Sequence, residues 1–131
     1  MLTSKSKNIL VVEDDPAMAE IVNHKLTQSG FGVRHAADGK IALEMLAQQI
    51  PDLMLLDLML PEVDGFQVLE AMRHSPDKKL AAVPVIVLSN LWSNQDILRA
   101  QALKADGYMV KAYFTTEEIL KKINEILTPK K

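Results

Sequence analysis

One carboxylate lies inside an otherwise apolar stretch of the sequence. Asp57 is preceded by Leu-Met-Leu-Leu at 53–56 and followed by Leu-Met-Leu at 58–60. Aspartate is rarely buried without a partner, because taking an unpaired charge out of water is costly. Such a residue is seldom there for packing. We therefore interpret Asp57 as a chemical group, since a carboxylate can act as a metal ligand or as a nucleophile.

Further polar residues follow other short apolar runs in the same way. They are Glu13 and Asp14 after residues 8–12, Ser89 after residues 85–88, and Lys111 after residues 108–110. Three carboxylates in one place repel one another, and an oxygen-rich, thiol-free set of this kind suits Mg²⁺ or Mn²⁺. Lys111 adds a positive charge and Ser89 a hydroxyl donor, which together complement an anion beside the metal. Taken alone, the acidic residues 13–15 are equally typical of a helix N-terminus.

The elements that must position these residues alternate along the chain. We expect strands at 8–12, 31–36, 53–57, 85–88 and 108–110, and helices at 16–29, 40–49, 64–73, 93–105 and 116–127, with a polar connection around 75–79. Five strands alternating with five helices predict an α/β fold with a parallel sheet and helices on both faces, because parallel strands need helical crossovers. In such folds ligands bind outside the carboxyl ends of the strands, where all the polar residues above would meet.

Length and composition exclude several classes of protein. The chain has 131 residues, a net charge of −2 and no cysteine. We expect one domain over residues 1–131 with its core at about 8–127, and no disulfide, thiol nucleophile or cysteine-based zinc site. The absence of a basic excess argues against direct nucleic-acid or membrane binding. The first residues lack a signal-peptide core and no apolar run is long enough to span a bilayer, so a cytoplasmic location is the default expectation.

Four motifs in this order resemble the receiver domain of response regulators in two-component signalling. They are Ile-Leu-Val-Val-Glu-Asp-Asp at 9–15, Leu-Leu-Asp-Leu-Met-Leu-Pro-Glu-Val-Asp-Gly at 55–65, Val-Leu-Ser at 87–89 and Gly-Tyr-Met-Val-Lys at 107–111. The resemblance covers about residues 8–127. It implies a flavodoxin-like fold of five βα units with the strand order 2-1-3-4-5.

The resemblance also implies a role for each site residue. Asp57 would accept a phosphoryl group from a sensor histidine kinase or a histidine phosphotransfer protein. Mg²⁺, or Mn²⁺ in its place, would be held by Glu13, Asp14, Asp57 and the main-chain carbonyl of Met59. The domain would signal rather than act as an enzyme, apart from self-phosphorylation by small donors and slow loss of the phosphoryl group.

Three further residues would contact or sense the phosphoryl group. Ser89 and Lys111 would bind its oxygens, and Tyr108 would turn inward when Ser89 moves, which changes a surface formed by the fourth helix, fifth strand and fifth helix. That surface would act on a downstream protein or on an output domain, in a monomer or a phosphorylation-linked dimer. The sequence leaves open whether the receiver stands alone or is cut from a longer protein.

Two departures from the family pattern keep an alternative open. Ala112 follows the lysine where the family commonly has proline, and Asn90 follows Ser89 where a small residue is usual. Either is compatible with a degenerate receiver that binds a partner without phosphorylation. A dehalogenase-like phosphatase also uses a strand-end aspartate, but its second aspartate would fall at Met59 and the chain has little room for a cap.

Other polar and aromatic residues carry weaker signals. The resemblance implies that positions 59 and 91 influence hydrolysis, and because Met59 and Leu91 cannot orient water we expect slow hydrolysis of the aspartyl phosphate. The three histidines, at 24, 35 and 74, have no ligand spacing and are interpreted as structural or surface residues. Trp92 fits a partner contact and a packed loop aromatic equally well.

Overall fold

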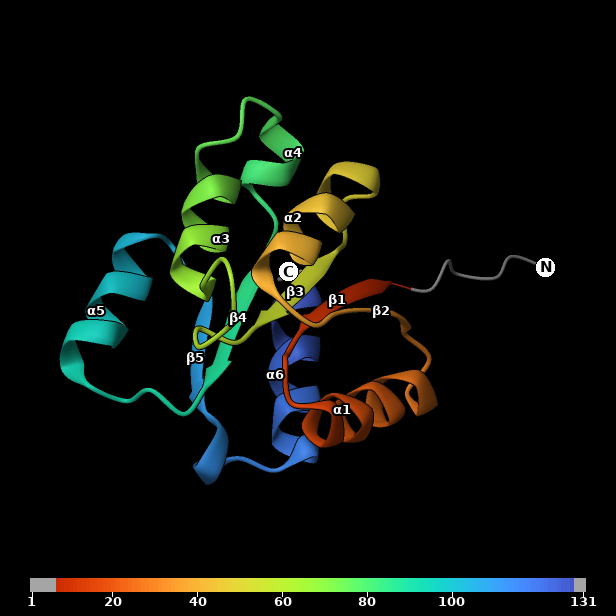
Figure 1. Cartoon of the computed structure of the whole chain (residues 1–131). Helices are drawn as coiled ribbons and strands as arrows, with labels where there is room; N and C mark the ends of the chain where they lie inside the picture. The colour runs from red at the N-terminus through yellow and green to blue at the C-terminus, as the bar shows by residue number, and fades with distance from the viewer. Residues whose placement is uncertain (1–6, 129–131) are drawn as a thin grey trace.

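The computed structural model describes residues 7–128 and contains one parallel sheet of five strands (Figure 1). The strands are β1 (Asn8–Val12), β2 (Gly32–Ala36), β3 (Leu53–Leu56), β4 (Val85–Ser89) and β5 (Gly107–Val110). Their order in the sheet is β2-β1-β3-β4-β5, and each neighbouring pair is parallel. The parallel sheet and the strand order 2-1-3-4-5 predicted from the sequence are both confirmed.

Helices cover both faces of the sheet. They are α1 (Pro16–Gln28), α2 (Gly39–Gln48), α3 (Gly65–Arg73), α4 (Lys78–Ala81), α5 (Asn94–Ala102) and α6 (Thr116–Leu127), with a 3₁₀ turn η1 (Lys111–Tyr113) after β5. Helices α1 and α6 pack on one face, whereas α2, α3 and α5 lie over the other (Figure 1). The first crossover, α1, lies on one face and the next three lie on the other, because the chain reverses direction after β2 and crosses β1 to reach β3, as in a doubly wound sheet.

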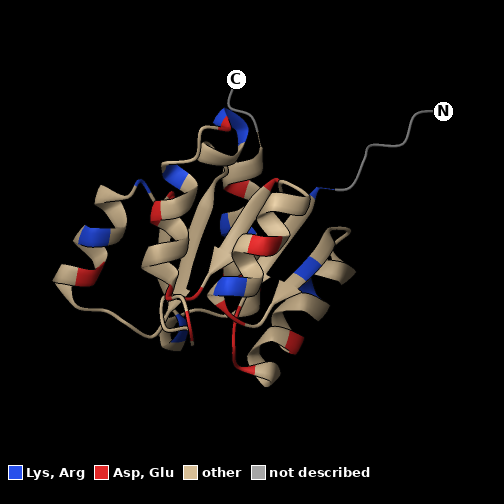
Figure 2. Cartoon of the chain, turned by 45° about the horizontal axis from the view of Figure 1, so that its top comes forward, with Lys and Arg blue, Asp and Glu red and all other residues tan. Residues whose placement is uncertain are grey.

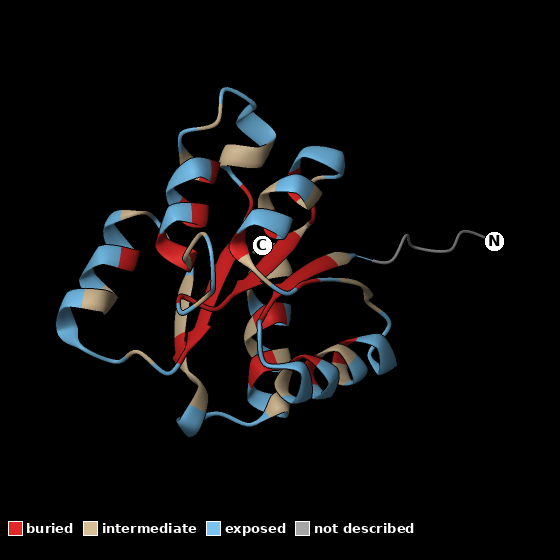
Figure 3. Ribbon diagram, in the orientation of Figure 1, coloured by how far each residue is buried: buried red, intermediate tan, exposed pale blue. Residues whose placement is uncertain are grey.

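The core consists of one apolar layer on each face of the sheet. Successive residues of β1 point to opposite faces, so Leu10 and Val12 pack toward α2 and α3 while Ile9 and Val11 pack toward α1 and α6. Strands β3 and β4 are buried along their whole length, which Figure 3 shows as a continuous buried band between helices whose outer sides are exposed. Burial on both faces explains why these strands read as unbroken apolar runs rather than as alternating patterns.

Side-chain caps fix where most helices begin. Asp15 caps α1 by accepting from the main-chain N–H of Ala17, and Pro16 occupies the first helical position. Asp64 and Thr115 each form a capping box, with Gln67 and Glu118 respectively. The helix starts predicted at these capping residues are confirmed.

Two helix boundaries differ from the sequence expectations. The polar connection expected at 75–79 contains the start of α4, a single turn capped by Asp77, which accepts from the N–H groups of Lys79 and Leu80. Helix α5 ends at Ala102 rather than near residue 105, because Lys104 adopts a left-handed conformation with φ 64°. The N–H groups of Lys104 and Ala105 then bond back to the carbonyls of Gln101 and Ala100, which is the Schellman pattern that ends a helix.

The distribution of charge and the lengths of the helices were compared with the expectations from the sequence. Positive and negative positions are interspersed along the helices shown in Figure 2, in keeping with the net charge of −2. Within residues 7–128, no helix is both long and apolar enough to cross a bilayer.

Candidate functional site

The register of the sheet brings the ends of four strands to one edge. Val12 of β1 pairs with Leu56 of β3, and Leu56 pairs with Val87 of β4. The chain leaves β1 and β3 directly after this level, and the main-chain N–H of Asp57 still donates to the carbonyl of Val12 at 3.0 Å. Residues 13, 14 and 57 therefore share one place because of strand length and register alone.

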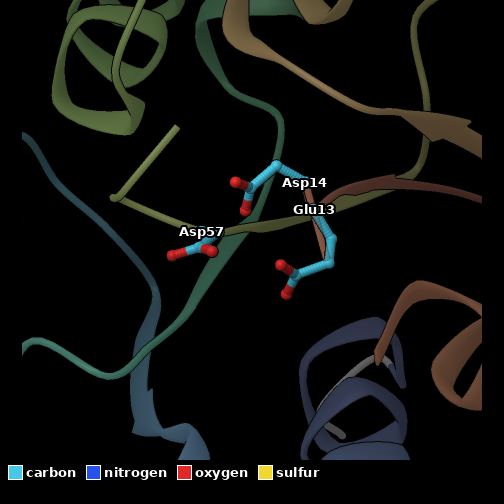
Figure 4. A group of neighbouring side chains, drawn as sticks. All are labelled: Glu13, Asp14 and Asp57. Carbon is cyan, nitrogen blue, oxygen red and sulfur yellow. The ribbon is translucent and has the colours of Figure 1, made fainter. Parts of the chain in front are cut away.

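The three carboxylates form one cluster at this edge. One carboxylate oxygen each from Glu13, Asp14 and Asp57 lies within 4.8 Å of the others, and Figure 4 shows the three groups turned toward a common space beside the ends of β1 and β3. Glu13 and Asp57 are 3% and 4% exposed, whereas Asp14 is exposed to solvent. Two buried carboxylates and one solvent-facing carboxylate fit a hard divalent cation that keeps part of its water shell, so the residues present fit Mg²⁺.

Lys111 joins two of these carboxylates. Its Nζ atom lies 2.6 Å from Oε1 of Glu13 and 2.9 Å from Oδ2 of Asp57. Burial alone would lower the pKa of Lys111, but its hydrogen bonds to Glu13 and Asp57 and their charges outweigh burial and raise that pKa. The ammonium therefore stays charged and offsets part of the negative charge at the bottom of the cluster.

Glu13 has a raised pKa in this arrangement. Burial raises the pKa of its carboxyl, and the neighbouring charge of Asp57 raises it further, although hydrogen bonds from Lys111 and the N–H of Asp15 act in the opposite direction. Three carboxylates and one lysine ammonium lie together here, so negative charge is in excess. The single ammonium leaves this excess incompletely balanced, which is the condition that favours a bound cation.

Both oxygens of the Asp57 carboxylate have hydrogen-bond donors. Oδ2 accepts from Lys111, and Oδ1 accepts from the main-chain N–H of Met59 at 3.1 Å. Met59 is 57% exposed, and its main-chain N–H is the group that bonds Asp57. Donors on both oxygens fix the orientation of the carboxylate.

Ser89 and Tyr108 lie next to the cluster but do not contact its carboxylates. Ser89 is fully buried at the end of β4, and its Oγ accepts from the N–H of Leu91 at 3.3 Å. The hydroxyl of Tyr108 donates to the main-chain carbonyl of Leu91 at 2.7 Å. Burial raises the pKa of Tyr108 to about 12, with a further contribution from the charges of Asp96 and Asp57. Ser89 and Tyr108 thus both bond to Leu91, in the connection between β4 and α5.

Gly65 is a site residue that sequence reasoning did not single out. A Cβ atom at this position would overlap the main-chain carbonyl of Asp57 and would lie 2.6 Å from Cα of Leu58. The N–H of Gly65 donates to the carbonyl of Leu58 at 3.0 Å. Only glycine lets the start of α3 approach the Asp57 main chain this closely. The Asp-Gly pair at 64–65 was the available signal, but it indicates a helix start and not the close approach.

His35 is a second residue whose position was not foreseen. It is exposed, in keeping with its interpretation as a structural or surface residue, and its Nε2 atom lies 2.7 Å from the main-chain carbonyl oxygen of Glu13. No spacing rule indicates this contact, because residues 13 and 35 are adjacent only through the pairing of β1 with β2.

Comparison with known proteins identifies the family. The family model described as the response regulator receiver domain matches residues 9–124. The chain belongs to this family. The receiver is a signalling domain rather than a classical enzyme, which removes the support for the phosphatase alternative.

Individual relatives agree with the family match. The receiver is 39% identical over 119 residues to the DNA-binding dual master transcriptional regulator RpaA of Synechocystis, covering 91% of this chain and 48% of that protein. Among solved structures, it is similar to the phosphorylated cyanobacterial phytochrome response regulator RcpA, with a TM-score of 0.83, 31% identity and 94% of each chain covered. It is also similar to the Mn²⁺-bound form of response regulator Rcp1, with a TM-score of 0.81, 30% identity and coverage of 95% and 97%.

The chain spans about half the length of the curated relatives it matches. One of these relatives is described as DNA-binding. The expectation of no direct contact with nucleic acid is therefore not supported for a longer protein that contains this receiver.

Proposed function

We propose that this receiver accepts a phosphoryl group on Asp57 from a phosphohistidine of a sensor kinase or a histidine phosphotransfer protein. The observation that carries the proposal is the cluster itself: a nearly buried aspartate held by Lys111 and accompanied by two further carboxylates. A structural role does not explain this arrangement, because an apolar core of the same size would avoid the cost of burying like charges.

Phosphoryl transfer to Asp57 requires accurate positioning of the reacting groups more than it requires an acid or a base. An oxygen of Asp57 attacks phosphorus in line with the imidazole nitrogen; the new O–P bond forms as the P–N bond breaks, and the imidazole leaves. Lys111 and the N–H of Met59 hold the carboxylate in one orientation for this attack. Mg²⁺, or Mn²⁺ in its place, would be held by Glu13, Asp14, Asp57 and the Met59 main-chain carbonyl and would neutralise phosphoryl oxygens.

The phosphoryl group would be sensed through Ser89 and Tyr108. A phosphoryl group adds negative charge and strong hydrogen-bond acceptors, for which the Ser89 hydroxyl and Lys111 are the nearby donors. Ser89 would then exchange its bond with the N–H of Leu91 for one with phosphate, and Tyr108 already bonds the carbonyl of Leu91. The β4–α5 connection thus carries the change toward α5, β5 and α6.

Two structural neighbours support the proposal of a bound metal ion and of phosphorylation. Rcp1 was solved with Mn²⁺ and RcpA in a phosphorylated form, at 30% and 31% identity to this receiver. In the same way, the similarity to the DNA-binding regulator RpaA suggests that the output of this receiver is transcriptional. The receiver would act on such an output, or on a separate protein partner, as a monomer or a phosphorylation-linked dimer.

Intact mass after incubation with acetyl phosphate tests the proposal. We expect a gain of one phosphoryl group that requires Mg²⁺ and is lost in Asp57→Ala. Glu70→Gln, which removes an exposed carboxylate on α3, is the matched control and should be phosphorylated like the wild type. A folded wild-type protein that gains no phosphoryl group from acetyl phosphate or from a cognate kinase would favour the degenerate receiver, which binds its partner unmodified.

A further inference from the structure

We propose that His35 is a positioning residue of this site, which holds the Glu13–Asp14 peptide so that the Asp14 carboxylate faces Asp57. The contact is a hydrogen bond from Nε2 of His35 to the main-chain carbonyl oxygen of Glu13, 2.7 Å long. This inference rests on the proposed function, because it concerns the metal affinity of the same three carboxylates.

Every other polar group of Glu13 is already assigned. Its N–H donates to the carbonyl of Ala36 at 3.0 Å. Its carboxylate accepts from Lys111 through Oε1 and from the N–H of Asp15 through Oε2 at 3.1 Å. The main-chain carbonyl is the remaining group, and His35 is its donor.

The carbonyl needs this donor because the neighbouring strand has ended. Within the parallel pair of β1 and β2, main-chain groups alternate as donor and acceptor up to Val12 and Ala36. Beyond Ala36 the chain turns away toward α2, so β2 offers no further N–H group at the level of Glu13. The His35 side chain, from the strand itself, takes the place of the missing main-chain donor.

Asp14 depends on this support more than the other two carboxylates do. Among the hydrogen bonds of residues 7–128, none holds the Asp14 side chain, whereas Glu13 and Asp57 are both fixed by Lys111. The rest of the protein therefore sets the position of the Asp14 carboxylate through the main chain that carries it, and the Glu13 carbonyl is part of the peptide unit that leads into Asp14. A peptide free to rotate would spend less time with Asp14 directed at the metal position, which weakens binding.

The bond also fixes the state of the imidazole. A carbonyl oxygen can only accept, so Nε2 must carry the proton. The neutral ring is then the Nε2–H tautomer, with Nδ1 free as an acceptor. The ring lines an open groove of about 480 Å³ together with residues of α1, among them Asn23 and His24. Water can enter this groove and replace a lost donor, so we expect removal of the ring nitrogen to affect orientation more than folding.

Three variants and one spectrum test the inference. His35→Leu removes the donor, His35→Gln keeps an N–H donor on a side chain of similar reach, and His24→Leu removes a histidine from the same groove without a bond to Glu13. The Mg²⁺ dissociation constant of each full-length variant is measured by NMR titration, with thermal unfolding as the check on folding. Long-range ¹H–¹⁵N correlation of the wild type without metal, at a pH where the ring is neutral, reports the His35 tautomer.

We expect His35→Leu to weaken Mg²⁺ binding by about three- to tenfold, the range that one lost hydrogen bond supplies. His35→Gln and His24→Leu should stay within about twofold of the wild type, and His35 should be the Nε2–H tautomer. Wild-type affinity in a folded His35→Leu, or the Nδ1–H tautomer, overturns the inference while leaving the proposed function intact. If His35→Leu does not fold, the Gln variant and the tautomer decide. Failure of the wild type to bind Mg²⁺ overturns both.

Discussion

The strands that carry the carboxylates and the helix α5 differ in how deeply they are buried. Strands β3 and β4, which position the site, are buried along their whole length. Helix α5 buries only Ala100; its own Leu98 is 62% exposed, and Trp92, just before the helix, is 68% exposed. Reacting groups must be held precisely, whereas an element that reports a change must be able to move at small cost.

Helix α5 is attached to the rest of the molecule by its buried Ala100 and by a few polar contacts. Arg99 lies over the ring of Phe66 in α3, with its guanidinium carbon 4.1 Å from the ring centre. The Tyr108 hydroxyl bonds the carbonyl of Leu91 just before the helix, and Arg73 bonds the carbonyl of Leu103 just after it. Interactions of this kind each contribute about 0.5–1.5 kcal/mol, much less than a buried aliphatic side chain does. Helix α5 is therefore held less firmly than strands β3 and β4.

The largest difference between the two regions is expected from loss of a leucine side chain. Leu55→Ala removes a side chain that is 1% exposed in β3 and should lower the free energy of unfolding by about 2–5 kcal/mol. Leu98→Ala removes the same atoms from the outside of α5 and should change that free energy by less than about 0.5 kcal/mol. Urea unfolding of both variants measures the contrast. Equal losses would mean that α5 is as firmly packed as the strands.

A second contrast compares two glycines: Gly65, which lies close to the Asp57 main chain, and Gly30, which has a positive φ. Gly65→Ala places a methyl group against the Asp57 main chain and should cost about 1–3 kcal/mol. It should also slow phosphorylation by acetyl phosphate, because relief of the overlap displaces Asp57 or α3.

Gly30→Ala is the matched control for this contrast. Gly30 has a φ of 96°, but a Cβ atom there meets nothing within 4 Å, and the residue follows α1 far along the chain from Asp57. We expect a cost of about 1–2 kcal/mol from strain, with the phosphorylation rate unchanged. A rate that falls equally in both variants would show that lost stability, and not geometry at Asp57, is responsible.

The sequence was sufficient for the strands and for the convergence of the site. Runs buried on both faces have an unmistakable composition, and residues placed directly after parallel strands must meet at one edge. It was not sufficient for α4, because one turn at Lys78–Ala81 has no periodicity to detect. The end of α5 was missed since Lys104 holds the left-handed position that glycine usually takes. The roles of Gly65 and His35 depend on tertiary neighbours, which local patterns do not encode.

The charge at the site gives a third contrast. Lys111→Gln removes the ammonium between Glu13 and Asp57 and leaves two nearly buried carboxylates facing each other. We expect the free energy of unfolding without metal to fall by about 1–3 kcal/mol. Mg²⁺ should stabilise this variant more than it stabilises the wild type, because the cation then meets a larger negative charge without competition from lysine.

Lys122→Gln provides the control for the charge effect. Lys122 is more exposed, at 38%, and its nearest carboxylate is that of Glu125 at 4.0 Å on the same helix. Its loss should change the stability by less than about 0.5 kcal/mol, with no altered response to Mg²⁺. Urea unfolding with and without Mg²⁺ measures both variants, and an equal response to the metal in the two would contradict a site centred on Glu13 and Asp57.

The smallest effect concerns the hydrogen bond from Tyr108 in β5 to the carbonyl of Leu91, just before α5. Tyr108→Phe removes the hydroxyl that donates to Leu91 and should cost about 0.5–1.5 kcal/mol, with faster amide hydrogen exchange confined to the start of α5. The wild type should also show a pH dependence that the variant lacks. The pKa of Tyr108 is raised to about 12 in the folded protein, above its ordinary value near 10, so folding disfavours the phenolate.

The sign of this dependence follows from linkage. The unfolded chain loses the Tyr108 proton at a lower pH than the folded protein does, so this contribution is complete below about pH 10 and is lost as the pH rises toward 12. The stability difference between wild type and Tyr108→Phe should therefore shrink over that interval, which unfolding curves at several pH values measure. A constant difference would show that the hydroxyl is equally free to ionise in both states, and that β5 and α5 are joined by packing alone.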